Sequence, residues 1–136
     1  MGVDELVAIA LVVLSGCKGE CVTVSTDCAP LYQPSFANVF RNTLQPTCAA
    51  SGASCHASSG GKGGLVFDTA DHAYGELVGV SGPTGRDRVV AGDPHCSLLV
   101  EKIESTKSSF QMPPGSPLSA EERCAIEQWI GNGAAR

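Results

Sequence analysis

Apolar residues along the chain fall into a helical rhythm only from about residue 35 onwards. One face of a helix is predicted by apolar positions spaced i, i+3, i+4 and i+8, namely Phe36, Val39, Phe40 and Leu44. Ser35 is well placed to cap the start of this helix. Pro46 is expected to end it, because proline lacks an amide hydrogen and clashes with the preceding turn.

Two helices are predicted in the middle of the chain. Residues 69–79 permit a short one. Asp93 suits the N-cap of the next and Pro94 its first position, with the helix continuing through Ile103.

The last helix is the clearest element. Ser119 and Glu122 form a capping box at its start, and Gly131 or Gly133 is expected to end it. Its apolar face consists of Ile126, Trp129 and Ile130.

Glycine and proline fill the stretches between these helices. Residues 57–64 are a flexible Gly-rich loop, residues 81–87 a turn region, and residues 111–117 hold three prolines that forbid a helix. No alternation of apolar and polar residues is long enough to predict a sheet. We therefore expect a small all-α domain over residues 34–136, with long loops between its helices.

The N-terminal region has a different pattern. An apolar run of nine residues, 6–14, is too short to span a bilayer but suits a signal peptide. It leads into Leu-Ser-Gly-Cys, which looks like a bacterial lipobox and predicts a signal peptide over residues 1–16 and lipidation of Cys17. The first five residues carry two acidic groups and no Lys or Arg, which is unusual for such a signal, and a buried N-terminal strand or helix is the alternative.

Residues 17–33 are expected to be a tether that could be pinned by a local bridge between Cys21 and Cys28. Two acyl chains or more would give stable attachment to a membrane. The predicted location is the cell envelope, facing the periplasm. Lys18 follows the lipobox in place of the Asp that resembles an inner-membrane retention signal, which favours the outer membrane.

Composition limits the protein class. The chain has 136 residues, of which 43% are hydrophobic and 17% charged, as in a globular protein. Aromatic residues make up only 5%, so a core formed without covalent help would be thin, and seven cysteines indicate an oxidising compartment. A net charge of −5 and the absence of any basic run give no support for nucleic-acid binding.

The candidate chemistry lies in the stretch from Cys48 to His56. Cysteine followed by histidine is how a chain holds haem c, but the usual spacing is C-x-x-C-H and here it is C-x6-C-H. Three states remain open: haem with thioethers from Cys48 and Cys55, haem with one thioether from Cys55, or no haem and a Cys48–Cys55 disulfide. A zinc site would need further ligands, and no second paired set is present.

Four stretches in order strengthen the haem interpretation: "CHASSGGKGGLVF" (55–67), "VVAGDPHCSLLVEKI" (89–103), "QMPPGSPLSAEE" (111–122) and "IEQWIGNGA" (126–134). Together they resemble the planctomycete-type cytochrome c domain found in bacterial lipoproteins. The resemblance implies a cytochrome c-like fold with covalently bound haem c (iron). It makes His56 the proximal and Met112 the distal iron ligand, with thioethers from Cys55 and Cys48.

Two further expectations follow from this resemblance. Cys96 and Cys124 each lie near the start of a helix, and the two helices should pack together in this fold, so a Cys96–Cys124 disulfide is expected. A protein with both axial positions filled suits single-electron transfer with partner proteins of the cell envelope, and not catalysis. The rival hypothesis is a disulfide-rich lipoprotein that has lost haem and serves as a binding or structural module. His72 and His95 are expected to be surface residues.

Overall fold

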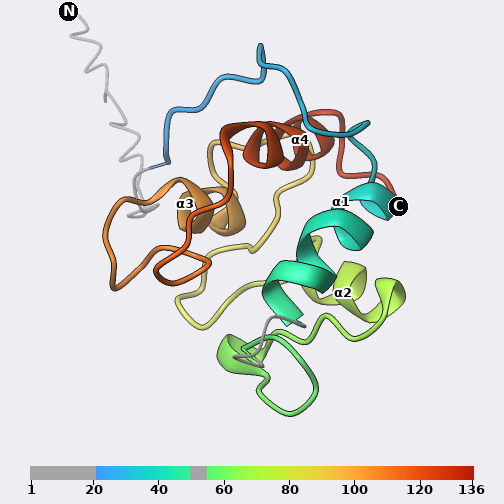
Figure 1. Ribbon diagram of the computed structural model, residues 1–136, viewed down its shortest axis with the longest axis vertical. Helices are drawn as coiled ribbons and strands as arrows, with labels where there is room; N and C mark the ends of the chain where they lie inside the picture. Colours follow the sequence, from blue (N-terminus) through green and yellow to red (C-terminus); the bar gives the residue numbers. More distant parts are fainter. Residues whose placement is uncertain (1–20, 50–54) are drawn as a thin grey trace, which may run out of the picture.

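The computed structural model describes residues 21–49 and 55–136 of the protein. Its four α-helices are joined by long loops (Figure 1): α1 Phe36–Val39, α2 Ala70–Leu77, α3 Leu98–Glu104 and α4 Ala120–Gly131. A π-helix, Phe40–Ala49, continues α1, and a 3-10 helix spans Lys62–Gly64. Within these described ranges β pairing is limited to isolated bridges. The predicted all-α fold with long loops is confirmed.

The first predicted helix forms but does not end at Pro46. Ser35 caps it, since its side chain accepts a hydrogen bond from the Asn38 amide. The chain then stays helical through Pro46 to Ala49 as a π-helix. Leu44 and Ala49 are buried on either side of the proline, and we attribute the continuation to this burial, which offsets the one hydrogen bond that proline cannot make.

Helix α3 starts later than the sequence predicted. Its N-cap is Ser97 and not Asp93. Asp93 instead closes a preceding turn, where its Oδ1 accepts from the Cys96 amide at 3.1 Å and its carbonyl oxygen accepts from the Ser97 hydroxyl at 2.8 Å. That hydroxyl also accepts from the Val90 amide at 2.9 Å. Ser97 is fully buried, and its hydroxyl makes both of these hydrogen bonds to the preceding turn. Ser97 is thereby held in the turn, and the helix begins at the next residue.

Helix α4 has the predicted capping box. The Ser119 hydroxyl accepts from the Glu122 amide at 3.1 Å, and the Glu122 carboxylate accepts from the Ser119 amide at 2.9 Å. The helix ends at Gly131. Its buried residues include Ile126, Trp129 and Ile130, the predicted apolar face.

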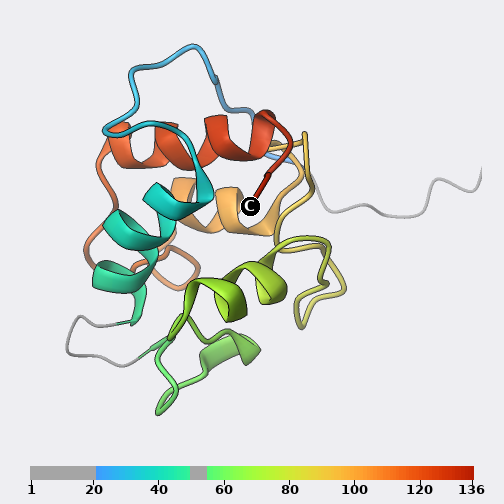
Figure 2. The same ribbon diagram turned by 90° about the vertical axis from the view of Figure 1, so that its right-hand side faces the viewer.

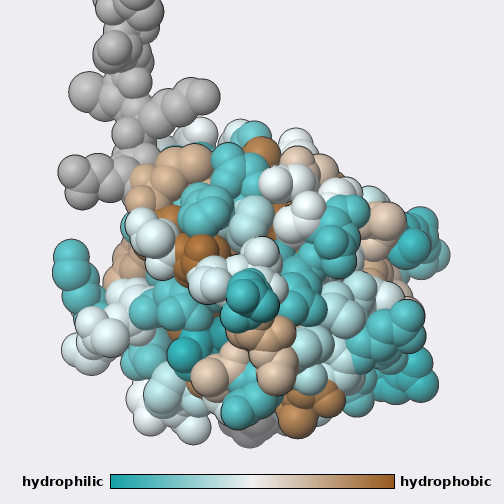
Figure 3. All heavy atoms as spheres, turned by 90° about the horizontal axis from the view of Figure 1, so that it is seen from above, coloured by the Kyte–Doolittle hydropathy of each residue, from teal (hydrophilic) through white to brown (hydrophobic). Residues whose placement is uncertain are grey.

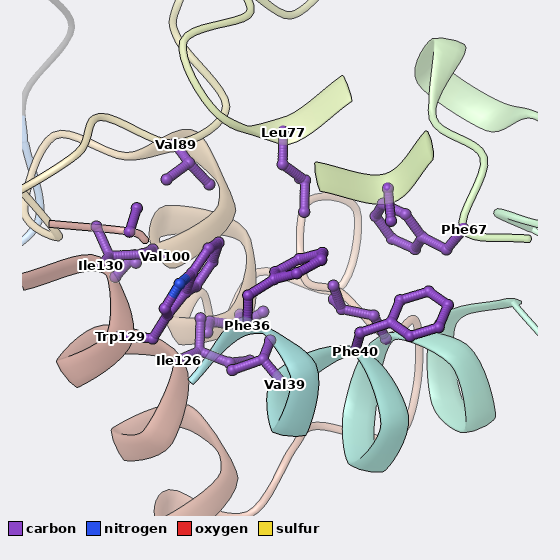
Figure 4. Packing of buried hydrophobic residues seen from close by; sticks show 14 of the residues in the cluster. Phe36, Val39, Phe40, Phe67, Leu77, Val89, Val100, Ile126, Trp129 and Ile130 are labelled. Carbon is purple, nitrogen blue, oxygen red and sulfur yellow. The ribbon is translucent and has the colours of Figure 1, made fainter. Parts of the chain in front are cut away.

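The core joins α1, α2, α3 and α4 around Phe36. Its ring lies 5.4 Å from that of Trp129 and 5.0 Å from that of Tyr74, measured between centroids. Figure 4 shows side chains of α1 and the π-helix between those of α4 on one side and Leu77 and Phe67 on the other. The C-terminal segment closes this core, since Tyr74 Oη and Trp129 Nε1 donate to backbone carbonyls of residues 134 and 135.

The four cysteines expected in disulfides are all bonded, but in a different pairing. Cys21 pairs with Cys96, and Cys28 with Cys124. The predicted Cys21–Cys28 and Cys96–Cys124 bridges are therefore wrong.

The path of residues 21–33 explains the pairing. This segment arches over α4 (Figures 1 and 2) and is hydrogen-bonded along its length: the Val22 amide donates to the His95 carbonyl at 3.0 Å, and Gln128 Nε2 to the Thr26 carbonyl at 2.8 Å. Seven residue steps reach about 23 Å at full extension, so a Cys21–Cys28 bridge would require the segment to turn back on itself. Instead, each of the two cysteines is bonded to the part of the domain beneath it. The segment assigned to a tether is thus part of the domain's covering layer from residue 21.

The surface is mixed in character. On the face shown in Figure 3, hydrophobic residues are interspersed with hydrophilic ones. In the part of the chain that the structure describes, Leu31 is the large hydrophobic side chain that is exposed, at 60%. No helix among these residues is both long and apolar enough to cross a membrane. The predicted signal peptide, Cys17 and the first part of the tether lie outside the described residues.

Candidate functional site

A large cavity brings together residues that are far apart in the sequence. Its volume is about 660 Å³, within the range of small-molecule and cofactor sites. The π-helix, the 55–67 segment, α3 and the 110–118 loop all contribute to its wall. All four residues predicted as haem attachment points or ligands line it: Cys48, Cys55, His56 and Met112.

His56 is held by the backbone on both sides. Its carbonyl accepts from the Phe67 amide at 2.7 Å, and its ring lies 5.3 Å from the Phe67 ring, measured between centroids. Its Nδ1 lies 3.3 Å from the Leu65 carbonyl oxygen. A carbonyl only accepts, so this contact places the ring proton on Nδ1 and leaves the Nε2 lone pair free for a metal. Burial lowers the pKa of His56, which favours the neutral form that a ligand requires.

Cys48 and Cys55 are both free thiols at the cavity wall. The Cys48 carbonyl accepts from the His56 amide at 3.2 Å, which ties the two cysteines and the histidine into one backbone unit. Burial, with smaller contributions from Glu122 and Cys55, raises the pKa of Cys48 to about 12. A thiol in this state is a poor nucleophile, which argues against a catalytic cysteine. Residues 50–54, most of the unusual six-residue spacer, lie outside the described residues.

Met112 is presented by a loop fastened to the last turn of α3. Its amide donates to the Lys102 carbonyl at 3.0 Å, and the Lys102 ammonium lies 3.7 Å from the centre of the Phe110 ring. Pro113 and Pro114 follow it on the cavity wall, as the sequence pattern indicated.

The cavity is also lined by cationic side chains that the sequence did not point out. Arg88 is buried, and its two terminal nitrogens donate to the carbonyls of Glu76 at 2.9 Å and Gly63 at 2.8 Å. Arg86 pairs with Glu101 and keeps Nη2 buried without a partner. Arg86 lies within residues 81–87, which the sequence identified only as a turn, and Arg88 follows directly after it. The one sequence signal for them was the charged "RDR" of residues 86–88.

The remaining candidate residues lie elsewhere. His72 and His95 are exposed, as predicted. His72 lies between Asp68 and Glu76, whereas His95 contacts the carbonyl of Val22. Among residues 21–49 and 55–136 no group of three or more His, Cys, Asp or Glu side chains is placed to hold a metal ion, which leaves a zinc cluster without support there.

The order and geometry of these residues agree with a comparison to protein families. The family model of planctomycete cytochrome C matches residues 53–116. The match supports a planctomycete-type cytochrome c domain, as the sequence motifs indicated. It runs from the Cys55-His56 pair through Met112, so it covers most of the cavity wall. No curated protein and no solved structure matches the chain.

A match to a cytochrome c family suggests electron transfer rather than catalysis. The cavity is consistent with that suggestion because two residues that could ligate iron, His56 and Met112, come from separate segments and line the same space.

Proposed function

We propose that the domain is a c-type cytochrome that holds haem c in this cavity and carries single electrons. The observation that carries the proposal is the convergence of Cys48, Cys55, His56 and Met112 on one cavity. These four residues come from three separate segments of the chain. They are the donor types that haem c requires: two thiols, an imidazole and a thioether.

The residues that line the cavity suit both the apolar ring and the carboxylates of haem. The apolar side is made by residues such as Leu44, Leu65, Phe67, Leu99 and Ile126. Haem also carries two propionate carboxylates, which need cationic partners. Four cationic side chains line the cavity against one acidic side chain, Glu101; they are Lys62, Arg86, Arg88 and Lys102. The buried, unpartnered Nη2 of Arg86 is a hydrogen-bond donor of the kind that a propionate would satisfy.

The chain's own residues would set the behaviour of the cofactor. Bound haem supplies a one-electron iron couple. His56 would ligate the iron through Nε2 and Met112 through its soft, neutral sulfur, which favours the reduced state and raises the reduction potential. The apolar side chains of the wall would keep water away from the bound iron.

Both thiols are available for attachment. Because Cys48 and Cys55 are free and line the same cavity, they support two thioethers over the Cys48–Cys55 disulfide that the sequence left open. The extended C-x6-C-H spacing would then be accommodated by the loop between them.

The cellular setting is part of the same proposal. Lipidation at Cys17 would anchor the protein in the cell envelope with the domain in the periplasm. Its partners would be redox proteins of that compartment. The two disulfides, which join residues 21 and 28 to the rest of the domain, support an oxidising compartment.

The decisive experiment is expression of the full chain with cytochrome c maturation machinery, followed by absorption spectroscopy. We expect covalent haem that survives acid and organic extraction, with a low-spin spectrum. His56→Ala should abolish that spectrum, whereas His95→Ala, a change at an exposed histidine that does not line the cavity, should leave it intact. Absence of haem under these conditions would refute the proposal and favour the haem-less structural module.

A further inference from the structure

The peptide unit between Leu65 and Val66 is hydrogen-bonded on both of its sides. Its carbonyl oxygen lies 3.3 Å from His56 Nδ1. Its amide donates to Glu76 Oε2 at 2.6 Å. A peptide unit is conjugated, so a negative charge at the N–H makes the carbonyl oxygen a stronger acceptor. One planar group therefore joins Glu76 to the candidate iron ligand.

Glu76 in turn belongs to a row of charged groups on α2 and the residues before it. Its Oε1 lies 2.9 Å from His72 Nε2, and His72 Nδ1 lies 2.9 Å from Asp68 Oδ1. His72 and Glu76 lie one turn apart on the same face of α2, and Asp68 precedes its N-cap, Thr69. The His72 side chain is 48% exposed, so it exchanges protons with solvent, whereas that of Glu76 is 23% exposed.

We propose that His72 tunes the haem held by His56, acting through Glu76 and the Leu65–Val66 peptide. The inference rests on the proposed function, because it concerns the potential of a haem ligated by His56. His72 and Glu76 would be positioning residues that never touch the cofactor. Their effect is on how strongly the His56 ring donates its Nδ1 proton, and hence how much electron density its Nε2 gives to iron.

The direction of the effect follows from the charges. With His72 neutral, the Glu76 carboxylate acts fully on the Val66 amide and strengthens the hydrogen bond from His56. A more basic ligand stabilises oxidised iron, so the reduction potential is lower. With His72 protonated, its positive charge offsets Glu76, and the potential is higher. By linkage, reduction strengthens proton binding at His72.

The groups around His72 determine the pH range over which the proposed effect should appear. The hydrogen bond to Asp68, aided by the charge of Glu76, raises the pKa of His72 above its ordinary value. Three further charged groups lie nearby. Asp71 pairs with Arg136, and Arg88 donates to the Glu76 carbonyl. The transition should therefore lie above the ordinary range of a histidine.

The test is NMR on the purified full chain, with a parallel potentiometric titration. In wild type we expect the Val66 amide shifts to titrate with the midpoint of the His72 ring, and the potential to fall as pH rises through it. His72→Asn should abolish both changes. Glu76→Gln keeps an oxygen acceptor for Val66 but removes the charge, so it should abolish the coupling too. His95→Asn, a change at an exposed histidine remote from this row, is the matched control and should behave as wild type.

Two results would overturn the proposed coupling of His72 to His56. One is a Val66 amide that does not respond while the His72 ring titrates. The other is a potential that falls with pH in His72→Asn as it does in wild type. Failure of the proposed function shows separately, as absence of haem from the absorption spectrum, and the Val66 response can still be measured in that protein. If Glu76→Gln does not fold, the exposed His72→Asn change still decides the question.

Discussion

Cys28 and Cys124 form a disulfide across 96 positions of sequence and fasten the segment 21–33 to α4. The Gln128 side chain reinforces the same junction by donating to the Cys28 carbonyl at 2.9 Å. Together with Cys21–Cys96, this bond makes the N-terminal segment a strap over the domain.

This pairing predicts the outcome of peptide mapping under non-reducing conditions. Proteolysis should release one linked pair of peptides containing Cys21 and Cys96 and another containing Cys28 and Cys124. Replacing both Cys28 and Cys124 by alanine should cost about 2–5 kcal/mol of the free energy of unfolding, because the open chain gains entropy when a long loop is released. Recovery of Cys21 linked to Cys28 would contradict the structure.

Much of the fold could be predicted from the sequence because its signals are local. The Ser119–Glu122 capping box depends on four consecutive residues, and it forms as expected. The disulfide pairing could not be predicted, since it depends on the path of residues 21–33 over α4, which hydrogen bonds between distant segments determine. Pro46 shows the converse case, in which burial of neighbouring residues overrides a local signal.

The candidate site also combines residues with a local sequence signal and residues without one. Cys55, His56 and Met112 stand in recognisable motifs, so the sequence alone could name them as candidates, and all three line the cavity. Arg86 and Arg88 lie in a turn without a motif, and their role becomes visible only once folding brings them to the cavity. Their place in the cavity wall depends on contacts between distant segments, which the residue type alone does not reveal.

Met112 is the subject of a second prediction. Met112→Ala should keep covalent haem, because the attachment points are elsewhere, but it should open the sixth coordination position. We expect a lower reduction potential and binding of carbon monoxide, which wild type should not bind. Absorption spectroscopy of the reduced protein under carbon monoxide measures this. Ser116→Ala, at another residue of the same loop and cavity wall, is the control and should remain low-spin. A low-spin Met112→Ala protein that excludes carbon monoxide would show that a different residue is the ligand.

Arg88 should contribute to stability independently of any cofactor. Arg88→Ala leaves the carbonyls of Glu76 and Gly63 without their charged donor. We expect a loss of about 2–4 kcal/mol in the free energy of unfolding, measured by urea denaturation. Arg41→Ala is the matched control, because Arg41 is exposed and its nearest side-chain contact, with Asn38, is 3.5 Å long. An unchanged midpoint in Arg88→Ala would mean that water satisfies both carbonyls.

Glu127 should make stability depend on pH. It is a buried carboxyl group on α4 with Oε1 unpartnered. Burial, the hydrogen bond with Glu104 and the charge of Glu104 raise its pKa to about 8, against an opposing effect of Arg123. The pKa of the unfolded chain stays near the ordinary 4.5. Between these values the folded protein holds a proton that the unfolded chain has released.

The sign of the dependence follows from that difference. Raising the pH from about 4.5 to about 8 favours the unfolded chain, so the Glu127 contribution to wild-type stability falls across this range and is constant above it. Glu127→Gln imitates the protonated acid and cannot titrate. The free energy of unfolding of this variant should therefore decline less between these pH values, so its stability relative to wild type should rise with pH. Glu121→Gln, a change at an exposed position of the same helix, should keep the wild-type slope. Thermal unfolding at a series of pH values measures all three proteins, and parallel curves for wild type and Glu127→Gln would show that Glu127 is ionised in the folded state at neutral pH.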